Sequence, residues 1–153
     1  MPRHSGAREH WGQGTGDFLR FGLRFWELPV FCDSWSPMQG TVDESIDYGG
    51  SSFVVFWEQG SGELVKLAEF LRTLPGHHGI RPFRGREAWH KRGVSVSLMG
   101  ELPVTLYGGE LFDGNCASII PNDQRLLPAL WCFCSSPEFN QAVRRIDQAL
   151  KER

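Results

Sequence analysis

The sequence has no long apolar run. Its longest uninterrupted apolar stretches are short pieces such as residues 53–57 and 130–134, whereas a helix that spans a membrane needs roughly 20 apolar residues. Residues 1–14 (MPRHSGAREHWGQG) lack the apolar segment of a signal sequence. We therefore expect a cytoplasmic protein with no membrane partner.

No disulfide framework is evident among the four cysteines of the chain, Cys32, Cys116, Cys132 and Cys134. A domain of this length does not need disulfide bonds to fold, so we predict free thiols. The spacing of the last two cysteines is not that of a zinc knuckle or a thioredoxin-like site, and no second pair completes a ligand set. The sequence therefore predicts no metal site.

Motifs for nucleotide binding and catalysis are missing. No Gly-Lys-Ser/Thr sequence occurs, which excludes a P-loop. The glycine-rich residues 12–17 (GQGTGD) follow residues 8–11 (REHW), which lack the pattern of a buried strand, so we expect no phosphate cradle there. No serine lies in a nucleophile elbow, and the carboxylates are scattered. A small unrelated enzyme using its cysteines or histidines is therefore the least favoured function.

The composition is that of one globular domain. The chain has 153 residues, of which 41% are hydrophobic and 22% charged, and single domains commonly run to about 100–150 residues. Residues 1–12 show no apolar periodicity. We predict a disordered segment over residues 1–12 and a single domain over residues 13–153.

The hydrophobic pattern predicts an α+β fold with a small, mostly antiparallel sheet and two to three helices, the last of them C-terminal. Strands are expected at residues 23–29, 53–57, 94–99, 102–107 and 116–120. Helices are expected at residues 61–74 and 127–133 and from residue 136 onward. A long irregular connection is expected between the first two strands.

Basic residues are concentrated in one segment. Between residues 80 and 93 a single acid, Glu87, accompanies five basic residues, which are Arg81, Arg84, Arg86, Lys91 and Arg92. Arginine suits forked contacts with phosphate and guanine. Trp89 lies among these residues and offers a face on which a base can stack. The pattern indicates a nucleic-acid surface; the alternative is a solvated loop that Trp89 merely anchors.

Several short motifs are most informative when they are taken in order. The first of them along the chain are residues 13–17 (QGTGD), 20–21 (RF), 25–27 (FWE), 85–89 (GREAW) and 91–94 (KRGV). After them come residues 102–104 (LPV), 114–116 (GNC), 119–121 (IIP), 127–131 (LPALW), 133–140 (FCSSPEFN) and 143–147 (VRRID). Over residues 12–150 this order resembles the region that follows the catalytic domain in large adenine-specific DNA methyltransferases of fused restriction–modification and phage-exclusion systems.

The resemblance implies a target-recognition region, detached from a larger enzyme, rather than a catalyst. The family methylates the exocyclic amine of adenine with S-adenosylmethionine, through an Asn-Pro-Pro-Tyr/Phe tetrapeptide and a Phe-x-Gly-x-Gly cofactor loop that lie upstream of this region. Neither motif occurs in this sequence. We therefore expect no catalytic residues and no cofactor in this chain, and a chain unable to methylate DNA alone.

The expected partner is double-stranded DNA, with a methyltransferase catalytic domain or subunit as a second partner. A base methylase flips its target out of the duplex, so another part must hold the helix and recognise flanking bases. The residues expected to contact DNA are Arg81, Arg84, Arg86, Trp89, Lys91 and Arg92, with Arg144 and Arg145 as weaker candidates. The family's glycine motif, without an assigned role, comprises Gly14, Thr15, Gly16, Asp17 and Arg20. The alternative function is a protein-interaction remnant that docks on a separate methylase catalytic domain.

Overall fold

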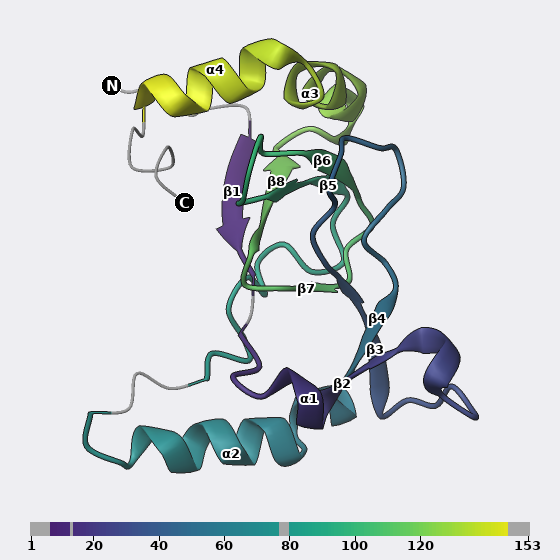
Figure 1. The fold of residues 1–153 in the computed structure, drawn as a ribbon, viewed down its shortest axis with the longest axis vertical. Coiled ribbons are helices and arrows are strands. Elements are labelled where there is room, and N and C mark those ends of the chain that lie inside the picture. The colour runs from purple at the N-terminus through teal and green to yellow at the C-terminus, as the bar shows by residue number, and fades with distance from the viewer. Residues whose placement is uncertain (1–6, 13, 77–79, 147–153) are drawn as a thin grey trace.

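The computed structural model describes residues 7–12, 14–76 and 80–146. The chain has the predicted α+β architecture, and its mostly antiparallel strands divide between two four-stranded sheets (Figure 1). The first sheet has the order β1-β8-β5-β6, formed by Ala7–Trp11, Cys116–Pro121, Gly93–Ser97 and Val104–Tyr107. The second has the order β2-β4-β3-β7, formed by Gly22–Arg24, Phe53–Phe56, Trp35–Gln39 and Leu111–Phe112. Only the β3–β7 pair is parallel.

The α-helices lie at the two ends of the elongated molecule (Figure 1). They are α1 (Phe18–Phe21), α2 (Glu63–Arg72), α3 (Leu127–Cys134) and α4 (Pro137–Ile146). Single 3₁₀ turns occur at Phe25–Glu27, Glu58–Gly60 and Gln124–Leu126. Within the described part of the chain, none of the helices has the length and apolar character needed to cross a bilayer.

Local chemistry explains where the predicted helices start. The Glu58 carboxylate accepts a 2.7 Å hydrogen bond from the Glu63 N–H and so satisfies a free donor at the beginning of α2. Leu64 and Ala68 lie on the buried face of this helix. Prolines in the first turns of α3 and α4 remove donors that would otherwise lack partners.

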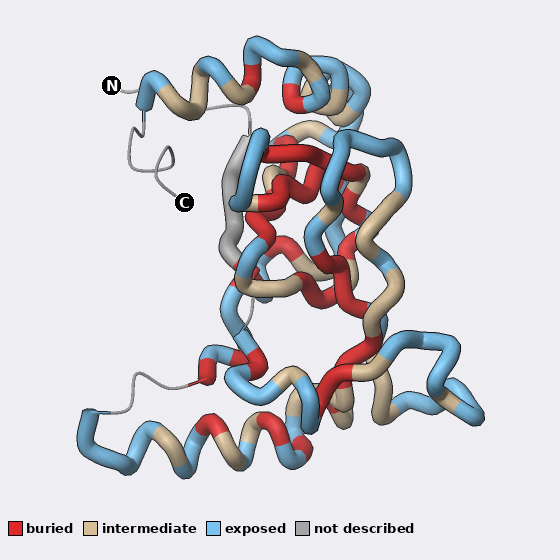
Figure 2. The backbone as a smooth tube through the Cα atoms, viewed as in Figure 1, coloured by how far each residue is buried: buried red, intermediate tan, exposed pale blue. Residues whose placement is uncertain are grey.

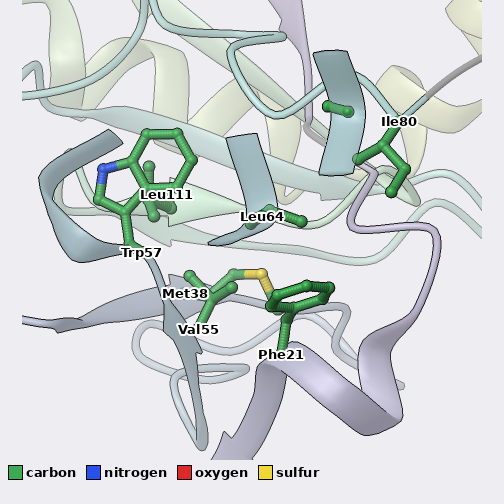
Figure 3. Packing of buried hydrophobic residues seen from close by; sticks show 8 residues of the cluster. Phe21, Met38, Val55, Trp57, Leu64, Ile80 and Leu111 are labelled. Carbon is green, nitrogen blue, oxygen red and sulfur yellow. The ribbon is translucent and has the colours of Figure 1, made fainter. Parts of the chain in front are cut away.

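Two main hydrophobic clusters hold the fold together. In the first, Phe21, Met38 and Val55 pack with Leu64, and Figure 3 shows the Met38 thioether directed at the ring of Phe21. The second lies between the first sheet and helices α3 and α4, and its buried members are Val94, Val96, Leu102, Val104, Cys134 and Phe139. Figure 2 shows the buried residues concentrated along the strands.

The loop over residues 40–52 covers the β6 edge of the first sheet. The Ile46 N–H donates to the Val104 carbonyl oxygen at 3.0 Å, and the Leu106 N–H donates to the Asp47 carbonyl oxygen at 3.1 Å. The buried hydroxyl of Thr105 accepts from the Gly49 N–H at 3.0 Å. These bonds satisfy backbone groups that an edge strand would otherwise leave open to pairing with another chain.

Besides the short elements α1 and β7, which were not expected, the structure differs from the sequence-based expectations in three segments. Residues 7–11, expected to be disordered, form β1, because β8 supplies antiparallel backbone partners across the register Ala7–Pro121 to Trp11–Ala117. The expected strand at residues 23–29 stops after Arg24, and the chain turns through Phe25–Glu27. The long connection contains β3, which pairs with both β4 and β7.

Candidate nucleic-acid interface

The basic segment, residues 80–93, is a chain of tight turns. Successive backbone N–H groups donate to the carbonyl oxygen three residues earlier, as from Arg84 to Arg81 at 3.1 Å and from Ala88 to Gly85 at 2.9 Å. The residues of the segment alternate between core and solvent: Ile80 and Ala88 are buried, whereas all five basic residues are exposed. The fold therefore presents the cationic side chains outward from an anchored backbone.

The charges of this segment are only partly neutralised. Arg86 lies 3.9 Å from the Glu87 carboxylate, an exposed and therefore weak ion pair. Lys91 donates to the Glu87 carbonyl oxygen at 2.7 Å. Arg81 and Arg92 make no ion pair with any residue that the structure describes. The segment thus carries net positive charge at the surface, as a phosphate-binding surface requires.

Trp89 is half-buried rather than fully presented to solvent. Its ring packs edge to face on Trp57, with 5.6 Å between centroids and an interplanar angle of 87°. The ring of Phe83 lies 6.4 Å away. The indole Nε1 is buried and has no hydrogen-bond partner among the described residues. Trp89 therefore anchors the segment, and only part of its surface remains for a ligand.

The turn between β6 and β7 supports the end of the basic segment. The His90 N–H donates a 2.7 Å hydrogen bond to the Gly109 carbonyl oxygen. A Cβ at Gly109 would lie 2.9 Å from both the His90 Cα and the Lys91 nitrogen. His90 itself has φ 62°, a left-handed conformation that costs a non-glycine residue energy. This close contact fixes where the basic segment ends.

The glycine motif lies beside the start of the basic segment. Gly14 forms an isolated antiparallel bridge with Arg81. Gly16 has φ 68°, and a Cβ at this position would lie 2.6 Å from the Ile80 side chain. The fold thus brings together two groups of candidate residues that are far apart in the sequence.

A strand does precede the glycine motif, contrary to the sequence-based expectation, since β1 ends at Trp11 and α1 begins at Phe18. The geometry nevertheless does not favour a phosphate cradle. Helix α1 has only four residues, and the Asp17 carboxylate occupies its N-terminus by accepting from the Arg20 N–H at 3.3 Å. A carboxylate in this position would repel phosphate.

The remaining candidate arginines differ in how firmly they are held. Arg20 lies 3.6 Å from the Glu63 carboxylate and covers the ring of Phe21. Arg144, a weaker candidate for DNA contact, donates to the Gly100 carbonyl oxygen and the Asn140 side chain, both at 2.8 Å. Arg145 is exposed. Arg144 is thus part of the connection between α4 and the turn before β6.

All four cysteines are free thiols, as predicted. Burial raises the pKa of Cys134 to about 11. Burial, with the nearby Asp113 carboxylate as a smaller cause, raises the pKa of Cys116 to about 12. Both thiols are therefore protonated near neutral pH, which makes them poor nucleophiles. Among the described residues, no group of three histidine, cysteine or acidic side chains is placed to hold a metal ion.

Sequence patterns did not predict a cavity of about 360 Å³ beside the basic segment. Trp57, Trp89 and Leu111 supply its apolar surface, and Ser36, His90 and Glu110 supply polar groups. These residues come from separate strands and turns, so no local spacing relates them. The only sequence signal is the richness in tryptophan, which does not distinguish a core residue from one that lines a cavity.

No protein-family model matches the chain, and no curated protein matches it significantly.

Proposed function

We propose that this chain is the DNA-recognition segment of an adenine-specific DNA methyltransferase of a restriction–modification or phage-defence system. It acts in the cytoplasm on double-stranded DNA. The chain binds no S-adenosylmethionine, and methylation depends on a separate catalytic domain. The order of the motifs along residues 12–150 supports the proposed family. The basic segment is the proposed DNA-binding surface.

The observation that carries this proposal is the outward array of Arg81, Arg84, Arg86, Lys91 and Arg92 on an anchored backbone. Side chains that neutralise phosphates release condensed counterions, so binding weakens as salt concentration rises. Arginines in such a surface also recognise guanine through forked hydrogen bonds in the major groove. An array held in place by turns loses less conformational entropy on binding than a flexible loop does.

Duplex binding measured by fluorescence anisotropy over a range of salt concentrations tests the proposal. We expect Arg84→Ala combined with Arg86→Ala to weaken binding and to reduce the slope of log K against log salt by about 0.9 for each lost phosphate contact. The control combines Lys66→Ala with Arg72→Ala on α2, which removes the same charge from exposed positions elsewhere. An unchanged slope in the first variant would place the DNA surface elsewhere.

A second candidate function, docking on a separate methylase catalytic domain, is favoured by one exposed apolar surface. The connection between β2 and β3 protrudes from the body of the molecule (Figures 1 and 2). It exposes Phe25 by 54%, Trp26 by 61%, Val30 by 71% and Phe31 by 57%. Contiguous apolar surface of this kind commonly marks a protein interface. Absence of duplex binding even at low salt would favour docking over DNA recognition.

A further inference from the structure

The cavity beside the basic segment has the features of a site for a flat aromatic ligand. Its volume of about 360 Å³ falls in the range of small-molecule sites. Trp57 and Trp89 both line it, and their rings are perpendicular, at 87°, so they do not form a parallel sandwich for a ligand. A planar ligand would therefore stack on a single indole face, as unpaired bases do on aromatic side chains.

Two residues that line the cavity, Glu110 and Trp89, each carry a polar side-chain group that lacks a partner within the described part of the chain. The Glu110 carboxylate makes no hydrogen bond or ion pair there, and this residue is only partly exposed. The indole Nε1 of Trp89 is buried without an acceptor. Unsatisfied buried donors are rare in folded proteins, and a missing ligand or water is a common reason for them. The Glu110 carboxylate is thus the acceptor group that the cavity wall offers to a ligand.

A carboxylate selects a base that presents donors. The Watson–Crick edge of guanine carries two adjacent donors, N1–H and the 2-amino group, which match the two oxygens of a carboxylate. Adenine and cytosine each place an acceptor nitrogen beside their single amino group, so one carboxylate oxygen would face a lone pair. Thymine presents one donor between two carbonyl groups. Guanine is therefore the base that complements Glu110 best.

A cationic side chain lines a hollow that adjoins the cavity. Arg92 lines a neighbouring hollow of about 390 Å³ whose wall also includes Gly108 and Glu110. Arg92 is exposed and forms no ion pair with a described residue. A base beside Glu110 would thus have a cation close to its own phosphate group, at the end of the segment that carries the other basic residues.

We propose that the cavity binds one unpaired guanine base of DNA held along the basic segment, with the base stacked on a tryptophan and its N1–H and 2-amino group donating to Glu110. This inference rests on the proposed DNA-binding function. Arg92 contacts the phosphate of the bound nucleotide. The site provides specificity for a guanine that is bulged or displaced from its pair, in addition to contacts with the duplex backbone.

Calorimetric titration with the four deoxynucleoside monophosphates tests the site without a duplex. We expect dGMP to bind about tenfold more tightly than dAMP, dCMP or dTMP. In NMR spectra, dGMP should also shift the indole N–H resonance of Trp89. Glu110→Gln replaces one acceptor oxygen with a donor at nearly constant shape and should abolish the preference for dGMP. Glu69→Gln, at an exposed position on α2, is the matched control and should retain it. Arg92→Ala should weaken dGMP binding and leave guanosine binding unchanged.

Anisotropy with three duplexes distinguishes failure of the site from failure of the proposed function. The duplexes are fully paired, or contain a single bulged guanine or a single bulged adenine. A preference for the bulged guanine that Glu110→Gln removes would support the inference. Equal affinity for all three duplexes, with binding still sensitive to Arg84→Ala and Arg86→Ala, would overturn the guanine site and leave the proposed function standing. Affinity for dGMP but for no duplex would overturn both.

Discussion

The N–H of His90 donates a 2.7 Å hydrogen bond to the carbonyl oxygen of Gly109, which joins the basic segment to the turn between β6 and β7. Both residues have positive φ, 62° for His90 and 107° for Gly109. The same turn contributes Glu110 to the cavity. This backbone hydrogen bond therefore holds three groups in fixed relation to one another. They are the end of the basic segment, the Trp89 indole that lines the cavity and the Glu110 carboxylate.

Replacing Gly109 tests this contact. A Cβ at Gly109 would lie 2.9 Å from the His90 Cα, so we expect Gly109→Ala to lower the free energy of unfolding by about 2–4 kcal/mol through backbone strain and displacement. Gly100→Ala is the matched control, since Gly100 also has positive φ, 64°, but a Cβ there meets nothing within 4 Å. It should cost about 1–2 kcal/mol. Equal losses in urea unfolding would contradict the role of the contact.

Alkaline pH should destabilise the fold. Burial raises the pKa of Cys134 to about 11 and that of Cys116 to about 12. The pKa of the Tyr107 hydroxyl is also raised above its ordinary value, mainly by burial and to a smaller extent by the negative charge of Glu110. Above about pH 9 the unfolded thiols lose protons that the folded ones keep. The unfolded state then binds fewer protons, so stability falls by about 1.4 kcal/mol per pH unit for each such group.

Urea unfolding from neutral pH to about pH 11 measures this loss. Cys134→Ala removes one of the two thiols and should reduce the slope of stability against pH over this range, whatever it does to stability at neutral pH. A slope equal to that of the unmodified protein would show that Cys134 ionises at the same pH in both states.

Thiol reactivity should separate the cysteines into two pairs. Cys32 and Cys132 are exposed, whereas Cys116 and Cys134 are buried and held protonated. Ellman's reagent near pH 8 should titrate two thiols rapidly in the native protein and four in urea. Cys32→Ser and Cys132→Ser should each remove one rapid equivalent. Rapid titration of all four thiols without denaturant would contradict the packing of the two buried ones.

Methyl transfer should be absent. The sequence contains neither the catalytic tetrapeptide nor the cofactor loop of the adenine methyltransferases. Purified chain incubated with DNA and labelled S-adenosylmethionine should give no incorporation above a protein-free control. Sustained turnover by this chain would overturn its assignment as a recognition segment that depends on a separate catalyst.

Helices α2, α3 and α4 and the central strands were predictable because their residues carry periodic patterns or helix-start signals. The repeat of leucines at helical spacing predicted the helix that is α2. The alternation of valines with serines predicted the strand that is β5. By contrast, β1 and β3 acquire their regular structure from distant partners, β8 for the first and both β4 and β7 for the second. Single-sequence patterns do not report such pairing, so both strands were missed.

The candidate site was predictable only in part. The high density of arginine identified the basic segment in the sequence. The basic side chains of this segment are exposed, which agrees with a charged surface. Trp89 stood out because it interrupts these charges, but its packing on Trp57 depends on the fold. Glu110 and Ser36 lie in separate parts of the sequence with no motif around them, and only the folded chain brings them to one cavity.

The pairing of β1 with β8 has a consequence for synthesis on the ribosome. The register joins Ala7 to Pro121 and Trp11 to Ala117, so the first strand has no partner until most of the chain has been translated. Closing so long a loop carries an entropic cost, and an unpaired strand is open to other partners in the meantime. Binding by a nascent-chain chaperone would protect residues 7–11 during this interval, and slower translation would lengthen it.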